Sequence, residues 1–370
     1  MGTKLEPVTF VRNMPSRDTK WPRKHALGTL ALACVLAFSW GCGSGGTTGS
    51  GTDGQANGTA AGKDSGKPRI ALVMKSLANE FFKTMEEGAR AHNEAHSGDY
   101  ELITQGIKNE TDVARQIQIM EQLTASGVDA IIISPADSKA LVSVCKKAMD
   151  AGVIVVNIDN KFDDDVLLDK DVKIPFVGPD NHKGARMVAN YVTDNLDPGS
   201  PVAVLEGAPN AYNAIQRQLG IEEALNEAGM AIVASQTAHW EMAEANTKAA
   251  AILAEHPEIK AIVCANDSMA LGAIAALKDA GMAGEILVSG YDNISAVQEL
   301  MEQGLIIATA DQHADHLAVY GIEYALEMLR GEDVPENRET PTDLVVAENG
   351  TLRTIPQAAA VATDPGLTPE

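Results

Sequence analysis

The sequence is poor in three kinds of residue, and each shortage excludes a class of protein. Phe, Trp and Tyr make up only 4% of the 370 residues, too few for the stacked aromatic surfaces that bind single-stranded nucleic acid. Lys and Arg number 29 against 51 Asp and Glu, and the net charge of −22 repels phosphate backbones. The four cysteines are too few and too scattered for a disulfide framework or a thiolate metal site. We therefore expect no nucleic-acid partner.

The chain also has few long apolar runs, and the one near its start is short. The run 26–38 cannot cross about 30 Å of hydrocarbon, but it suits the apolar core of an export signal because Arg23 and Lys24 precede it. Cys42 follows a small residue and opens a Gly/Ser-rich stretch, a pattern that resembles a bacterial lipoprotein signal. We expect residues 1–41 to be a signal, Cys42 to be lipidated and residues 42–67 to be a tether. An ordinary cleaved signal and an uncleaved anchor are the alternatives.

The rest of the chain alternates short β-rich runs with amphipathic helices. Several runs are continuously apolar, as expected of parallel strands that are covered on both faces. The expected strands are 70–74, 100–104, 130–133, 154–157, 176–177, 202–205, 232–234, 261–264, 286–289 and 306–309. Ten strands exceed one ordinary open sheet, so the pattern predicts an α/β protein with two doubly wound parallel sheets. The Asp-rich loop 161–173 is the expected seam between them.

Polar and aromatic residues of one kind follow many of these strands. Ligands of doubly wound sheets bind at the carboxyl ends of the strands. Carboxylates, amides and Arg form paired hydrogen bonds with vicinal hydroxyls, and flat aromatic rings match the C–H faces of a sugar. The sequence therefore predicts a carbohydrate pocket rather than a phosphate or metal site. Its candidate residues are Lys75, Asn79, Phe81, Phe82, Asp159, Asn160, Arg217, Trp240, Asn266, Asp292 and Gln312.

Each candidate also has an ordinary structural interpretation. Asn266 and Asp292 stand where helices begin, and either is a common N-cap residue. Phe81 and Phe82 could belong to the core, and Lys75 could extend along the surface into water. The placement of the whole set at strand ends in both expected sheets favours a common site.

Residues 68–347 resemble a periplasmic sugar-binding protein of the ribose-binding type, the solute receptor of an ABC importer. The matching segments are 70–73, 79–82, 130–135, 264–272 and 290–292. The resemblance implies a type I periplasmic binding protein with two lobes joined by a three-strand hinge. It implies one lobe of residues 68–178 plus 313–340, and another of 179–312 plus 341–349. Residues 350–370 are expected to form a C-terminal tail.

The resemblance also implies a function and a role for each candidate residue. The chain is expected to bind an allose-like hexose or a ribose-like sugar as the lobes close. Phe82 and Trp240 would sandwich the ring, and Asp159 and Arg217 would bond its hydroxyls from opposite lobes. Lys75 is closer to the allose-binding type. Asn160 departs from both types, since the ribose type carries Arg there and the allose type an acidic group.

The remaining expectations concern partners and rival functions. The partners implied are a monosaccharide and an importer permease. The protein is expected to be a monomer in the periplasm or cell envelope, and to contact the membrane only through its lipid anchor. A receptor for a polyol, inositol or furanosyl signalling molecule is the alternative. We expect no cofactor, no metal and no enzyme activity, because the Gly-x-Ser-x-Gly, Walker and Gly-x-Gly-x-x-Gly patterns are all missing. A regulator of the lac-repressor type would need a helix-turn-helix segment where this chain has its signal.

Overall fold

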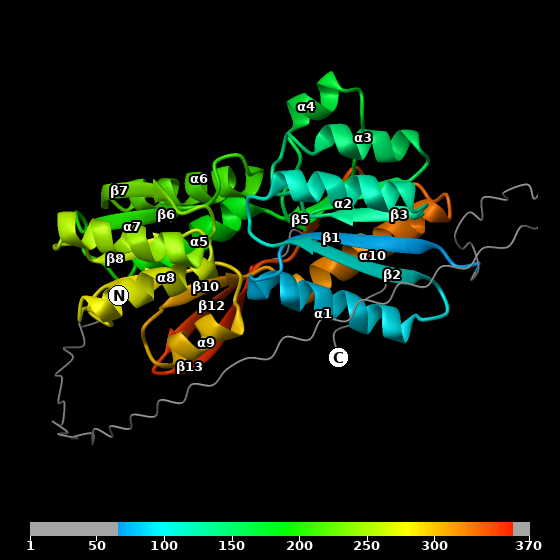
Figure 1. Cartoon of the computed structure of the whole chain (residues 1–370). Coiled ribbons are helices and arrows are strands. Elements are labelled where there is room, and N and C mark those ends of the chain that lie inside the picture. Colours follow the sequence, from blue (N-terminus) through cyan, green and yellow to red (C-terminus); the bar gives the residue numbers. More distant parts are fainter. Residues whose placement is uncertain (1–65, 358–370) are drawn as a thin grey trace, which may run out of the picture. The chain divides into compact units, whose positions relative to one another are not determined.

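The computed structural model describes residues 66–357, which form two α/β lobes built around separate sheets (Figure 1). The expected signal, Cys42 and nearly all of the tether lie outside these residues. The first sheet has the order β11-β5-β4-β3-β1-β2, and all of its strands are parallel. Its strands are β1 (Arg69–Ser76), β2 (Glu101–Ile107), β3 (Ala130–Ile133), β4 (Ile154–Ile158), β5 (Phe176–Pro179) and β11 (Asn337–Thr340).

Helices cover both faces of the first sheet because its strands are apolar on both sides. In β1, Ile70 and Leu72 pack in the same apolar cluster as Met85 and Leu317, whereas Ala71 and Val73 belong to the cluster on the opposite face. Figure 1 shows α1 and α10 on one face and α2 and α3 on the other. The helices of this lobe are α1 (Glu80–Ala95), α2 (Val113–Ala125), α3 (Val142–Asp150), α4 (Asp164–Asp169) and α10 (Ala314–Leu329).

The second sheet has the order β13-β12-β10-β9-β8-β6-β7. It is parallel from β7 to β10, and β12 and β13 extend it in antiparallel fashion. The strands are β6 (Pro201–Glu206), β7 (Ala231–Thr237), β8 (Ala261–Cys264), β9 (Leu287–Ser289), β10 (Ala308–Asp311), β12 (Asp343–Glu348) and β13 (Thr351–Pro356). The helices are α5 (Asn181–Thr193), α6 (Tyr212–Glu227), α7 (Met242–Glu255), α8 (Asp267–Asp279) and α9 (Ser295–Glu302).

Helices α5 and α6 pack closely because a glycine stands at their contact. A β-carbon at Gly220 would lie 2.3 Å from the carbonyl oxygen of His182 on α5. This distance is far shorter than any van der Waals contact. The absence of a side chain therefore sets how near the two helices lie, and α6 carries residues of the candidate site described below.

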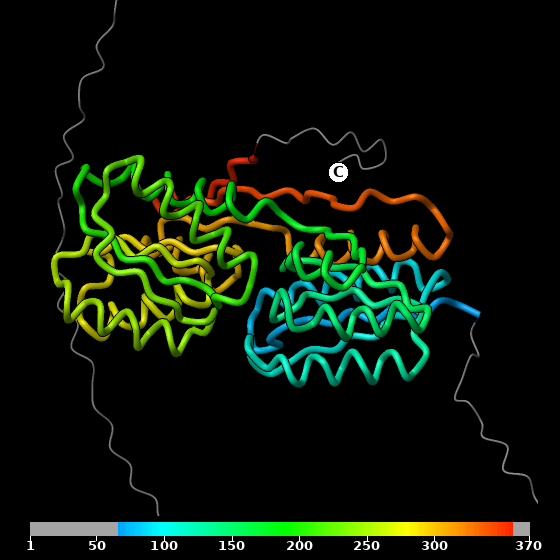
Figure 2. The backbone as a smooth tube through the Cα atoms, turned by 90° about the horizontal axis from the view of Figure 1, so that it is seen from above, coloured from blue at the N-terminus to red at the C-terminus, as the bar shows by residue number. Residues whose placement is uncertain are grey.

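The chain passes between the sheets three times, and the passages correct two expectations. They follow β5, β10 and β11, as the tube in Figure 2 shows. The loop 161–173 is not the seam: it contains α4 and precedes β5, which still belongs to the first sheet. Residues 351–356 are not part of a tail, because they form β13 in the second sheet. In the part of the chain described, no helix is long and apolar enough to cross a membrane.

Candidate functional site

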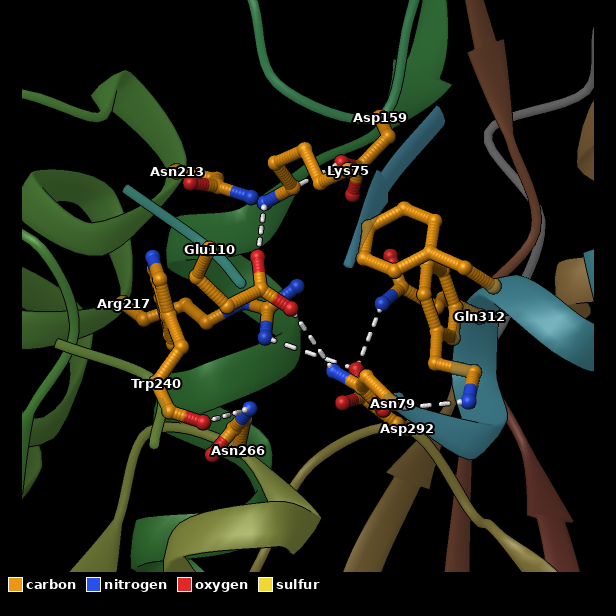
Figure 3. A pocket seen from close by; sticks show the side chains of 12 residues that line it. Lys75, Asn79, Glu110, Asp159, Asn213, Arg217, Trp240, Asn266, Asp292 and Gln312 are labelled. Atoms are coloured by element: carbon orange, nitrogen blue, oxygen red, sulfur yellow. Dashed lines mark hydrogen bonds and ion pairs between the residues drawn. The ribbon is translucent and has the colours of Figure 1, made fainter. Parts of the chain in front are cut away.

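A small cavity lies at the carboxyl ends of the strands, and both lobes line it (Figure 3). The first lobe contributes Lys75, Asn79, Phe81, Phe82, Glu110 and Asp159. The second lobe contributes Asn213, Arg217, Trp240, Asn266 and Asp292, and Gln312 stands at the second passage between the sheets. The cavity has a volume of about 20 Å³, which is room for one water molecule. The lobes are therefore closed over an almost filled space.

The first lobe places one ammonium between two carboxylates. Lys75 Nζ lies 3.5 Å from Glu110 Oε2 and 3.5 Å from Asp159 Oδ2, and all three residues are buried. Burial disfavours the charged ammonium, but the attraction of Asp159 and Glu110 outweighs it, so the pKa of Lys75 lies above its ordinary value. Burial raises the pKa of Glu110, although Lys75 opposes this shift. Asp159 has a left-handed backbone (φ 61°) just after β4, which directs its carboxylate to accept a hydrogen bond from Ser134 Oγ at 2.5 Å.

The second lobe holds a buried guanidinium by several contacts at once. Arg217 donates from Nε to Asn181 Oδ1 at 2.7 Å and from Nη1 to the Ala265 carbonyl at 2.9 Å. Its guanidinium carbon lies 3.6 Å from the centre of the Tyr291 ring, and Nη1 lies 3.5 Å from Asp292 Oδ1. Burial raises the pKa of Asp292 well above its ordinary value, although Arg217 opposes this. Arg217 is thus fixed in direction before any ligand arrives.

Aromatic rings close the cavity from both lobes. Phe81 and Phe82 stand edge to face with centroids 5.0 Å apart, and they belong both to the core and to the cavity wall. Trp240 lies in the turn before α7 with a left-handed backbone (φ 70°). A β-carbon at Gly207 would lie 2.2 Å from the Trp240 ring, so only glycine leaves room for the indole. The Lys75 ammonium lies 5.3 Å from the Phe82 centroid and 5.5 Å from the Trp240 ring.

The amide side chains both build the site and line it. Asn79 caps α1 by accepting from Phe81 N, and Asn266 caps α8 by accepting from Met269 N. Asp292, by contrast, does not cap a helix, because α9 begins after Ile294. Its carboxylate accepts from Gln312 Nε2 at 2.7 Å instead.

Three buried oxygen atoms of the cavity wall have no hydrogen-bond donor among the described residues: Glu110 Oε2, Asn213 Oδ1 and Gln312 Oε1. Lys75 neutralises the charge at Glu110 but lies beyond the usual hydrogen-bond length. A buried acceptor without a donor costs about 1–3 kcal/mol. The wall therefore offers three acceptors to a molecule that brings O–H or N–H donors.

The structure brings together ten of the eleven residues that the sequence singled out. Asn160 is the exception. It is fully buried beside the cavity, and its side chain bonds protein atoms rather than facing the cavity. Glu110 and Asn213 were missed. Glu110 follows β2 and so obeys the strand-end rule, and Asn213 stands one helical turn before Arg217.

No group of three or more His, Cys, Asp or Glu within residues 66–357 is arranged to hold a metal ion. Cys145 and Cys264 are buried and unpaired, and burial raises the pKa of both thiols. Neither thiol belongs to the cavity wall.

The fold and the interlobe cavity agree with the comparison with known proteins. Residues 70–333 match the family model described as a periplasmic binding protein domain. The chain belongs to this family. A relative from Pseudomonas aeruginosa, the D-ribose/D-allose-binding protein, is 53% identical over 286 residues, which are 76% of this chain and 89% of that protein.

Solved structures of other periplasmic binding proteins share this architecture. An ABC transporter solute-binding protein from Burkholderia multivorans is 50% identical with a TM-score of 0.74, and the match covers 76% of this chain and all of that one. Its ligand is unknown and was built as alpha-D-erythrofuranose. A solute-binding protein from Actinobacillus succinogenes 130z, 35% identical with a TM-score of 0.73, holds D-allose; the match covers 77% of this chain and 99% of that one.

Proposed function

We propose that this periplasmic binding protein is the substrate receptor of an ABC sugar importer and binds a monosaccharide between its closing lobes. The observation that carries the proposal is the set of unpaired acceptors on the cavity wall, Glu110 Oε2, Asn213 Oδ1 and Gln312 Oε1. A sugar offers several hydroxyl donors around one ring. It satisfies acceptors that come from both lobes, so its binding favours the closed arrangement.

The remaining wall suits the rest of a sugar ring. The faces of Phe82 and Trp240 attract partial positive charge, and the Lys75 ammonium lies near both rings. The C–H faces of a pyranose carry weak positive charge and can take this place once Lys75 moves aside. Asp159, Asp292 and Arg217 then face the ring hydroxyls, and charge-assisted bonds contribute about 1.5–3 kcal/mol each.

An allose-like hexose is the proposed ligand, ahead of ribose. A displaced Lys75 retains three N–H donors, which can reach a hydroxyl beyond the outline of a pentose. The relatives named for ribose and allose, and the neighbour with bound D-allose, support this choice. A polyol, inositol or furanosyl signal remains the alternative, because it offers the same hydroxyl donors.

The other proposed properties concern the place and partners of the receptor. The family is periplasmic, and the segment 26–42 supports export followed by lipid attachment at Cys42. We propose a monomer that binds without turnover and delivers sugar to a membrane permease. Mass spectrometry of the mature protein tests the anchor, since the first residue would be an acylated Cys42.

A thermal-shift screen of D-allose, D-ribose and myo-inositol tests the function. A ligand that binds only the folded state raises the melting temperature. At a concentration 100 times its Kd, it increases the free energy of unfolding by about 2.7 kcal/mol. We expect the largest rise with D-allose, and chromatography should recover the sugar unchanged after hours.

Two variants make the screen specific to the cavity. Arg217→Ala should abolish the rise, whereas Arg186→Ala on α5 should keep it, because Arg186 pairs with Glu223 and Glu227 of α6 and does not line the cavity. No rise with any sugar would contradict the receptor, and conversion of the sugar would indicate an enzyme.

A further inference from the structure

Helix α6 begins without a capping side chain of its own. Its N-cap residue is Ala211, which offers no oxygen to the free N–H groups of the first turn. Of the helices described, α1, α2, α4, α5 and α8 receive this bond from an Asn or Asp that directly precedes them. The first turn of α6 instead takes its side-chain acceptors from another part of the chain.

The acceptors come from the opposite lobe. Ser138 Oγ, in the segment after β3, accepts from Tyr212 N at 2.9 Å. Asn160 Oδ1, in the turn after β4, accepts from Asn213 N at 3.1 Å. Ser138 and Asn160 are buried and joined by a 3.3 Å hydrogen bond, and Asn160 Nδ2 is anchored on the Pro135 carbonyl at 2.8 Å. These bonds cross the cleft, so they exist only while the lobes are closed.

We propose that Ser138 and Asn160 are positioning residues that cap α6 across the cleft and so couple lobe closure to ligand affinity. The inference rests on the proposed function, because α6 carries Asn213 and Arg217 into the cavity. Opening the lobes exchanges the two protein acceptors for water. The caps contribute to every closed complex equally, since neither side chain lines the cavity. This role also accounts for an amide at position 160.

Ser138→Ala is the test, because Ser138 can lose its hydroxyl without leaving a charge or a large void. We expect D-allose and D-ribose to lose affinity by the same factor of about five, which is roughly 1 kcal/mol, through faster dissociation. Ser138→Thr, which keeps the hydroxyl, should restore most of the affinity. Calorimetry and stopped-flow fluorescence of Trp240 give the two measurements.

Controls separate this role from stability and from sugar contact. Asp112→Ala removes the cap of α2 inside the first lobe, where Asp112 Oδ1 accepts from Arg115 N at 3.1 Å, so it should lower the melting temperature and leave affinity unchanged. Unchanged affinity in Ser138→Ala would overturn the proposal, and so would a loss confined to one sugar. If no ligand of the thermal-shift screen binds the wild-type protein, the proposed function fails instead.

Discussion

Asp267, at the start of α8, is a fully buried carboxyl group that has no cation within ion-pair distance in the described part of the chain. Its oxygens accept from Ile294 N at 2.9 Å and from Thr309 Oγ1 at 2.8 Å. Burial raises the pKa of Asp267 to about 7, against the opposing effect of these bonds. At neutral pH the group thus titrates in the folded protein.

This pKa predicts a stability that falls as the pH rises. Between about 4, the ordinary pKa of an aspartate, and about 7, the folded chain binds more protons at Asp267 than the unfolded chain does. Its contribution to the free energy of unfolding therefore decreases across this window and levels off above it. Denaturant unfolding at pH 5 and pH 8 should show a smaller decrease for Asp267→Asn than for wild type. Asp194→Asn, at an exposed position, should behave as wild type. Identical pH dependence in all three proteins would contradict the buried, protonated carboxyl.

The site residues could be predicted where they follow the rule that ligands bind at the carboxyl ends of parallel strands. Parallel strands bring their carboxyl ends together, and this geometry gave ten lining residues from Lys75 to Gln312. The direction of a side chain is a different matter. Asn160 follows β4 just as Asp159 does, but the left-handed backbone of Asp159 directs the two side chains apart. No pattern in the sequence predicts the left-handed backbone at Asp159.

At the scale of elements, the contact between α5 and α6 predicts a cost for any side chain at position 220. Gly220→Ala would place a methyl group against the His182 carbonyl and the backbone nitrogen of Arg186. Because both atoms belong to backbone, the helices must separate, and overpacking of this kind costs about 1–3 kcal/mol. We expect a lower free energy of unfolding by that amount and a weaker affinity for D-allose, since α6 carries Arg217.

The matched control is Gly98→Ala, where a β-carbon meets no atom within 4 Å. It should change neither quantity. A Gly220→Ala protein as stable as wild type would show that α5 and α6 can move apart without lowering the free energy of unfolding.

The same scale shows why some strands escaped prediction. The ten expected strands correspond to β1 to β10, which stand in the β/α alternation of the sequence, and several of them are continuous apolar runs. Strands β11, β12 and β13 were missed. The chain passes between the lobes once more between β11 and β12. Strand β11 is polar, with the sequence Asn-Arg-Glu-Thr, and β13 alternates at an exposed edge. Their pairing depends on partners far away in the chain, which local patterns do not report.

The molecule as a whole is held closed by contacts at the rims of the cleft as well as by α6. Asn210 Nδ2 donates to Asp137 Oδ2 at 2.8 Å, Glu110 N donates to Glu241 Oε1 at 3.0 Å, and Ser295 N donates to Glu80 Oε1 at 2.8 Å. The three passages of the chain join the two lobes and can act as a hinge.

A cavity of about 20 Å³ admits no monosaccharide, so the lobes must part before a sugar enters. We expect solution scattering to give a larger radius of gyration without ligand than with saturating D-allose. Arg217→Ala, which would lose a proposed ligand contact of the second lobe, should keep the larger radius at the same sugar concentration. Equal radii for the wild type with and without bound sugar would refute the hinge.

The Lys75 ammonium lies near both aromatic rings, so a ligand that binds between the rings must displace it. An incoming solute must take over both ring faces from a cation that remains tethered to β1 beside its two carboxylates. A molecule that covers only one ring makes fewer ring contacts than the ammonium that it would have to displace. We therefore expect small polyols such as glycerol to compete poorly with the Lys75 ammonium for the two rings. Lys75 would thereby set a lower limit on the size of the ligand.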